Sequence, residues 1–287
     1  MKHLGFSVGG TRIAGLLGSA IAIKESGYKP NVLSGNSAGS IVALLYAMDL
    51  LEEGKEIMNN FNSKVLFSLK PFSFLGIVYG IGRAVLGKKS INKMKLKALI
   101  NKVIIKSEFE RYKFDKNSSP VYVGAVSIKD GSKVVWNIKN YSYDQAMNMI
   151  LASCSIPGLT EPVFIDNNYY VDGGLRDFIV SNDLYDMLVI NESITVYSKP
   201  FDDVILDGKK KLNFTSIVAN TFDILMTEIA KEDQVQEIRN CIRLNIKLRQ
   251  IFLPSILKGI FDDDPTRLKE LFFQSYTITN NKLKNDF

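Results

Sequence analysis

The sequence predicts an α/β fold in which a mostly parallel or mixed sheet is flanked by helices. Two successive units of strand, turn and helix carry this prediction. In the first unit, an apolar strand at residues 3–7 leads through a glycine-bearing turn to helical spacing at 13–26, and in the second a strand at 31–34 leads to an apolar helix at 38–51. Repetition of this unit is typical of parallel sheets, because the helix returns the chain to the same sheet edge. A chain of 287 residues can bury a sizeable core, and we expect one domain over residues 1–287.

Further elements follow from alternation, helical spacing and turn residues. We expect helices at 91–105 and 143–154, hairpins at 121–138 and 163–171, a strand at 193–198, and a mainly helical region at 213–287. The segment at 62–90 differs from all of these, because it mixes aromatic residues, glycines and lysines without a clear period. Two interpretations stay open for it: a buried insertion that completes the core, or a mobile lid (a helical cap) that meets a lipid surface.

The composition narrows the class of protein. The two cysteines, Cys154 and Cys241, form no paired spacing, so zinc and redox motifs are absent and a reducing compartment is expected. We therefore expect a cytoplasmic protein that contacts membranes peripherally, and the sequence leaves open secretion without a classical signal peptide, since no such peptide is visible. The net charge of +6 is compatible with an anionic membrane surface, whereas no nucleic-acid reader motif is present. The sequence does not predict an oligomeric state.

The main candidate for chemistry is a G-x-S-x-G motif at Gly35, Ser37 and Gly39. It lies between a predicted strand and a predicted helix, where a sharp turn would present the serine hydroxyl at the end of the sheet. The helix that begins at Ala38 would direct its first N–H groups at the same place and favour developing negative charge. This context predicts that Ser37 is a nucleophile.

As a nucleophile the serine needs a base, and no histidine follows Ser37 in this chain. The only histidine is His3, which precedes Ser37 and is expected at the surface or at a strand end, away from the predicted site. Either the serine is inert, or a carboxylate takes the proton. Asp172, followed by Gly173 and Gly174, ends a predicted strand in a turn that could approach another backbone closely. Asp-Gly-Gly is also a common turn sequence, so this motif alone decides nothing.

A third glycine-bearing turn follows the first strand. Gly9 and Gly10 lie there, and their N–H groups, together with that of Ala38, are candidates for an oxyanion hole. A phosphate-binding or merely tight turn is the alternative, although neither G-x-G-x-x-G nor a P-loop fits the sequence.

In chain order, these motifs are the Gly9–Gly10 turn, G-x-S-x-G at 35–39 and Asp-Gly-Gly at 172–174, and in this order they resemble the patatin-like phospholipase family. The stretch at 152–158, before Asp172, is also similar to the family, whereas Val8, Ile13, Phe178 and Val180 depart from its usual residues. The resemblance implies a serine acyl hydrolase with a Ser37–Asp172 dyad, which releases fatty acid from phospholipids or lysophospholipids through a covalent acyl-enzyme. It implies no metal and no organic cofactor.

Two other functions stay open. The same dyad could serve an esterase or acyltransferase that acts on a non-lipid ester. Alternatively, the chain could be a non-catalytic protein that keeps the fold to bind membranes or a partner.

Overall fold

The computed structural model describes residues 1–60, 93–157, 160–199, 214–257 and 262–284. The predicted insertion at 62–90 lies outside these residues. The strands are β1 (Lys2–Phe6), β2 (Val32–Gly35), β3 (Val121–Ser127), β4 (Lys133–Asn137), β5 (Val163–Ile165), β6 (Asn168–Asp172), β7 (Glu192–Tyr197) and β8 (Lys247–Phe252). The helices are α1 (Ile13–Glu25), α2 (Ala38–Met48), α3 (Leu51–Asn60), α6 (Lys93–Val103), α7 (Lys106–Phe114), α8 (Tyr143–Ser153), α9 (Ser181–Met187), α10 (Phe214–Leu244) and α11 (Pro265–Lys284).

The eight strands of the described residues form one mixed sheet, which confirms the predicted fold class. Their order is β5-β6-β3-β2-β1-β7-β8, with β4 also paired to β3. Strands β3, β2, β1, β7 and β8, which are neighbours in this order, are parallel to one another. Strands β4, β5 and β6 are joined to the sheet by antiparallel pairs. Both expected hairpins, β3–β4 and β5–β6, are present.

The strand register brings three turns to one edge of the sheet. Phe6 at the end of β1 pairs with Gly35 at the end of β2, so the turns after these two strands emerge side by side. Strand β6 runs back against β3 and ends with Asp172 opposite Ala125, two residues beyond the pairing of Gly35 with Val123. The carboxyl ends of parallel strands are the usual location of sites in α/β sheets, and Asp172 reaches this edge from the antiparallel side.

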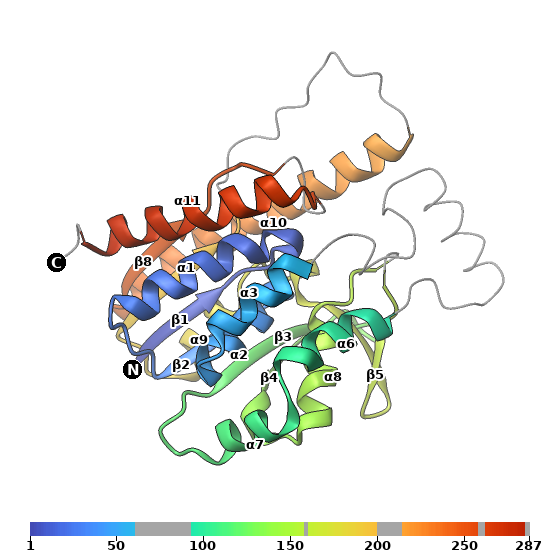
Figure 1. Cartoon of the computed structure of the whole chain (residues 1–287), viewed down its shortest axis with the longest axis horizontal. Coiled ribbons are helices and arrows are strands. Elements are labelled where there is room, and N and C mark those ends of the chain that lie inside the picture. The colour runs from blue at the N-terminus through green and yellow to red at the C-terminus, as the bar shows by residue number, and fades with distance from the viewer. Residues whose placement is uncertain (61–92, 158–159, 200–213, 258–261, 285–287) are drawn as a thin grey trace.

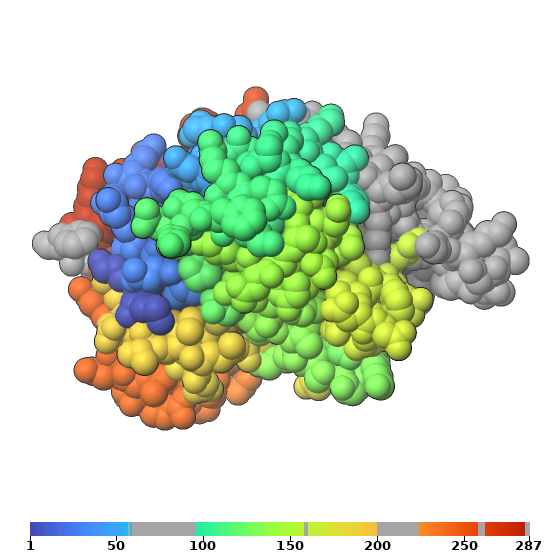
Figure 2. Space-filling model, turned by 90° about the horizontal axis from the view of Figure 1, so that it is seen from below, coloured from blue at the N-terminus to red at the C-terminus, as the bar shows by residue number. Residues whose placement is uncertain are grey.

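Helices cover both faces of the sheet, as Figure 1 shows. The larger core joins one face to α1, α2, α3, α6, α7, α8 and α11, and it contains the alternate residues Leu4 and Phe6 of β1. Helix α1 is buried over residues 13–23, because α11 lies along its outer side. Seen from below, α7 and α8 (green) adjoin each other and the β5–β6 hairpin (yellow-green) lies next to α8 (Figure 2).

The opposite face of the sheet is covered by α9 and α10 and is partly polar. The side chain of His3 lies on this face. Its ring nitrogens lie 2.8 Å from the Ser193 hydroxyl and 2.9 Å from the Ser34 hydroxyl. His3 lies at the start of β1, as expected, but the expectation of a surface position was wrong, because His3 is fully buried between neighbouring strands. Burial lowers the pKa of His3 to about 3, so the ring is neutral.

A buried carboxylate of α10 organises the same face. Glu237 is fully buried, and its two oxygens accept hydrogen bonds from five side chains. The donors are Ser181 (2.5 Å), Tyr185 (3.0 Å), Thr195 (3.1 Å), Tyr197 (2.8 Å) and Gln250 (2.7 Å). These donors come from α9, β7 and β8, so one side chain ties α10 to three other elements. Buried carboxylates require such partners, because an unpaired one would be very costly.

Among the described residues, no helix combines the length and the apolar character needed to cross a membrane.

Candidate active site

Ser37 lies in a tight turn between β2 and α2. Its backbone has φ 51° and ψ −125°, a strained conformation for a residue with a side chain. Besides backbone hydrogen bonds, two serine side chains hold this turn: the Ser37 N–H donates to Ser153 Oγ (2.9 Å), and Ser40 Oγ donates to the Ser37 carbonyl (2.6 Å). Neither Ser40 nor Ser153 was predicted to have this role, because their spacing from Ser37 follows no motif.

The glycines of the motif are required by close contacts on both sides of Ser37. A Cβ atom at Gly35 would lie 2.3 Å from the Gly39 carbonyl, and one at Gly39 would lie 2.4 Å from the carbonyl oxygens of Phe6 and Ser7. Real Cβ atoms do not approach backbone atoms so closely, so any other residue would force the start of α2 away from the ends of β2 and β1. The G-x-S-x-G spacing is therefore a packing requirement of this turn.

Asp172 lies against Ser37, as the order of the motifs predicted. Ser37 and Asp172 line the same pocket, and the Gly174 N–H donates to Asp172 Oδ1 (2.8 Å). Burial raises the pKa of Asp172 from 3.8 to about 7, although the nearby Gly174 N–H and Ser37 hydroxyl favour the ionised form and act in the opposite direction. A carboxylate with this pKa can accept a proton near neutral pH, as a general base must.

The turn after Asp172 packs directly on the other two turns. A Cβ atom at Gly173 would lie 2.6 Å from Asn36 Oδ1, and one at Gly174 would lie 2.7 Å from Val8 Cγ1. Gly173 and Gly174 thus allow the aspartate turn to meet both the nucleophile turn and the turn after β1.

The candidate oxyanion hole lies in the turn after β1. Gly10 has φ 53°, in the left-handed region that favours glycine, and begins a short 3₁₀ turn at Gly10–Arg12. The Val8 N–H donates to the Phe178 carbonyl (3.0 Å), so Val8 itself is not a free donor. Within the described part of the chain, the N–H groups of Gly9, Gly10 and Ala38 donate no hydrogen bond to another residue.

These turns line a small pocket. Its lining residues are Val8, Gly9, Gly10, Ser37, Ile156, Pro157, Asp172, Gly174, Leu175 and Met226. The volume is about 20 Å³, which is room for about one water molecule. Its wall is mostly apolar. Met226 of α10 was not predicted as a lining residue, since it lies far from every motif in the sequence.

The Cys154 thiol and possible metal ligands are the other candidates for reactive chemistry among the described residues. Cys154 is buried next to Ser37, and burial raises the pKa of its thiol, which keeps it neutral and a poor nucleophile. Nowhere in the described residues do three or more His, Cys, Asp or Glu side chains gather in a way that could hold a metal ion.

Comparison with known proteins points to one family. A family model described as patatin-like phospholipase matches residues 4–184. No curated protein matches the chain. Among solved structures, VipD from Legionella pneumophila is similar with a TM-score of 0.50 and 12% identity, over 99% of this chain and 67% of that one. At this identity the similarity concerns the fold alone. It covers nearly the whole chain, and so extends beyond residues 4–184, which the family model matches.

Proposed function

This chain belongs to the patatin-like phospholipase family, and on that premise we propose that it is a serine acyl hydrolase with a Ser37–Asp172 dyad. One observation carries the proposal: Ser37 lies in a strained turn and shares a pocket with the buried carboxylate of Asp172, beside N–H groups without partners among the described residues. The family is one of lipid acyl hydrolases. We propose phospholipids or lysophospholipids as the substrates.

In the proposed reaction, Ser37 Oγ attacks the ester carbonyl carbon and passes its proton to Asp172. The carbonyl oxygen becomes negative and accepts hydrogen bonds from the N–H groups of Gly9, Gly10 and Ala38. The tetrahedral intermediate then expels the alcohol, which takes the proton from Asp172 and leaves an acyl-Ser37 ester. Water, deprotonated by Asp172, attacks this ester; the Ser37 Oγ–acyl bond breaks, Asp172 returns the proton to Ser37 Oγ, and the fatty acid is released.

The raised pKa of Asp172 fits both halves of this cycle. An ordinary aspartate would be too weak a base to take a hydroxyl proton at neutral pH. Burial raises the pKa to about 7, so the same group can accept the serine proton and return it to the leaving alcohol. The neutral His3 lies at the start of β1, at the far end of the strand from the turn that holds Gly9 and Gly10.

The test combines labelling with product analysis. We expect a fluorophosphonate probe to label the wild type and the control Ser132→Ala, in which an exposed turn serine is removed, but not Ser37→Ala. Wild type should release fatty acid from mixed phospholipid vesicles, and Ser37→Ala and Asp172→Asn should not. Because the two residues act as one unit, the double variant should be about as inactive as either single variant. Release from short soluble esters but not from lipids would favour the esterase or acyltransferase alternative, and an unreactive Ser37 would favour a non-catalytic protein.

We also propose that the protein meets anionic membrane surfaces, since its net charge is +6. Each cation near such a surface contributes about 1 kcal/mol to binding, and salt screens the contribution. Lys88 and Lys89 of the predicted insertion are the residues to test, although they lie outside the described residues. Their replacement by glutamate should weaken sedimentation with anionic vesicles and leave hydrolysis of a soluble ester unchanged. Equal binding to neutral and anionic vesicles, at low and high salt, would contradict this proposal.

A further inference from the structure

Residues 177–179, which we call the linking segment, form hydrogen bonds through their backbone to the three turns of the site. These are the turn after β1, the turn that holds Ser37 and the turn after Asp172. The Asp177 carbonyl accepts from Asn36 Nδ2 (2.7 Å), next to the nucleophile. The Phe178 carbonyl accepts from the Val8 N–H (3.0 Å), next to Gly9, and the Asp177 N–H donates to the Gly173 carbonyl (3.0 Å). A shift of this segment would therefore move all three turns relative to one another.

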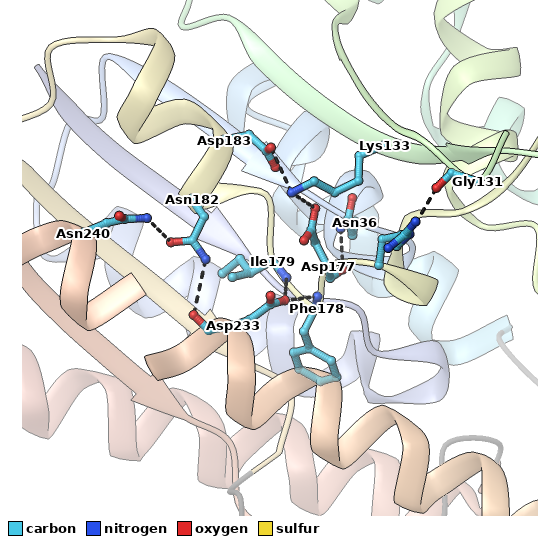
Figure 3. Close-up of polar contacts among 11 residues, drawn as sticks. Asn36, Gly131, Lys133, Asp177, Phe178, Ile179, Asn182, Asp183, Asp233 and Asn240 are labelled. Atoms are coloured by element: carbon cyan, nitrogen blue, oxygen red, sulfur yellow. Dashed lines mark hydrogen bonds and ion pairs between the residues drawn. The ribbon is translucent and has the colours of Figure 1, made fainter. Parts of the chain in front are cut away.

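A carboxylate of α10 holds the linking segment. Asp233 Oδ2 accepts hydrogen bonds from the Phe178 N–H and from the Ile179 N–H (3.4 Å), and Figure 3 shows both contacts. Asp233 is 7% exposed, so these bonds are shielded from water. They satisfy two buried donors that would otherwise have no partner there.

The face of α10 that carries Asp233 is the one that reaches the site. Met226, which lines the pocket, and Ala230 precede Asp233 by seven and three residues, a spacing that places all three on one face of a helix. Met226 and Ala230 pack with Val8 and Phe178 in one apolar cluster. The helix and the linking segment thus contact each other through apolar side chains and through the Asp233 carboxylate.

Asp233 and the linking segment are themselves fixed by neighbouring groups. Asn182 Nδ2 donates to the Asp233 carbonyl (3.3 Å), which anchors this turn of α10 to α9. On the other side, Lys133 of β4 forms ion pairs with Asp177 (2.9 Å) and Asp183 (3.0 Å). The segment is therefore held between β4 and α10, and Asp233 is the acceptor for the N–H groups of Phe178 and Ile179.

We infer that Asp233 is a positioning residue of the active site, which aligns the Gly9–Gly10 turn with Ser37 by fixing the backbone at Phe178 and Ile179. This inference rests on the proposed hydrolase function. Asp233 touches neither the pocket nor the reacting atoms, so its effect passes through the Val8 and Asn36 hydrogen bonds. The oxyanion donors act mainly in the transition state, so their displacement should lower kcat and change KM little.

The experiment compares variants of α10 with a short soluble ester as substrate. Asp233→Ala should lower kcat by about tenfold or more. Complete loss of one oxyanion donor typically lowers kcat by on the order of 100-fold, and a displaced donor should cost less than a lost one. Asp233→Asn should fall between Asp233→Ala and wild type, because an amide oxygen can still accept from Phe178 and Ile179. The rate of fluorophosphonate labelling of Ser37 should fall in the same order.

The matched control is Asn240→Ala, which removes another buried polar side chain two turns further along α10. Asn240 donates a hydrogen bond to Asn182 (3.1 Å), and among the described residues no hydrogen bond joins Asn240 to the linking segment. Its loss should lower Tm and leave kcat unchanged. If Asp233→Ala does not fold, Asp233→Asn supplies the comparison.

The inference is overturned if both Asp233 variants keep kcat and labelling rate within about twofold of wild type while Tm falls as in Asn240→Ala, since that pattern belongs to a purely stabilising residue. An inactive wild type with an unlabelled Ser37 gives a different pattern. It overturns the proposed function, and the inference with it.

Discussion

Replacing Asp172 with asparagine should make the protein more stable at neutral pH while it removes activity. The folded state keeps Asp172 buried, where its pKa is about 7 instead of 3.8. Between these two values the folded protein holds a proton that the unfolded chain has lost, so the free energy of unfolding decreases as pH rises. Above pH 7 the folded protein bears the full cost of an ionised buried carboxylate, and asparagine does not.

The size of the effect follows from the two pKa values. A rise from 3.8 to about 7 corresponds to about 4 kcal/mol of destabilisation at pH 8, and about 2 kcal/mol at pH 5, where the folded form is mostly protonated. Asparagine can keep the hydrogen bond from the Gly174 N–H through its Oδ1. For a chain of this size, each 1 kcal/mol shifts Tm by about 2 °C. The Asp172→Asn variant should therefore melt about 8 °C above wild type at pH 8 and about 4 °C above it at pH 5.

Thermal melts of both proteins at several pH values test this reasoning. Other titrating groups, such as Asp177 and Asp233, are present in both proteins, so the difference in Tm isolates Asp172. Ser37→Ala serves as a second inactive protein, and it should lack the pH-dependent gain because its Asp172 still ionises. A Tm difference that stays constant between pH 5 and pH 8, or a less stable Asp172→Asn at pH 8, would refute the assignment of a buried, raised-pKa carboxylate.

Three other changes follow from the geometry of the site. In wild type, kcat/KM for a soluble ester should rise with pH through about 7 and then level off, because the base must be ionised; a profile that is flat from pH 5 to pH 9 would argue against Asp172 as the base. Gly10→Val should lower turnover by about 100-fold or more, since valine disfavours the φ of 53° at this donor; full activity would place the oxyanion donors elsewhere. His3→Ala should keep kcat but lower stability by about 2–4 kcal/mol in denaturant titrations, because it leaves a cavity and two buried serine hydroxyls without their partner; a loss of kcat in folded protein would instead restore a role for histidine.

Much of the sheet and the proximity of Ser37 to Asp172 were predictable because their signals are local. Glycines mark the close contacts of the nucleophile and aspartate turns. The β5–β6 hairpin was expected to turn at Asn167 and Asn168, and it turns one residue earlier, at Asp166 and Asn167, whose positive φ values suit a tight turn. The second helix shows the limit of such signals. It was expected to reach residue 51, but it ends at Met48, because Asp49 adopts a left-handed conformation and α3 begins anew at Leu51.

The features that were missed depend on contacts between distant residues. Strand β8 was assigned to a helical region, because Lys247, Arg249 and Gln250 interrupt its apolar residues and only pairing with β7 reveals it. The short helix α9 was not predicted either. The burial of His3 could not be predicted, since its two partners lie 31 and 190 residues away along the chain. The same is true of Met226 and Asp233, which α10 brings to turns that precede them by more than 40 residues.

The position of the last elements in the fold has a consequence for how the protein is made. Strand β1 lies in the interior of the sheet, α11 covers α1, and Asp233 and Met226 reach the site from α10. During synthesis the N-terminal strands and helices emerge first, with apolar surfaces that only the C-terminal third of the chain can cover. Contacts at such long sequence separation close slowly. The nascent chain should therefore remain without a complete pocket, and exposed to aggregation, until α10 and α11 have been translated and have docked.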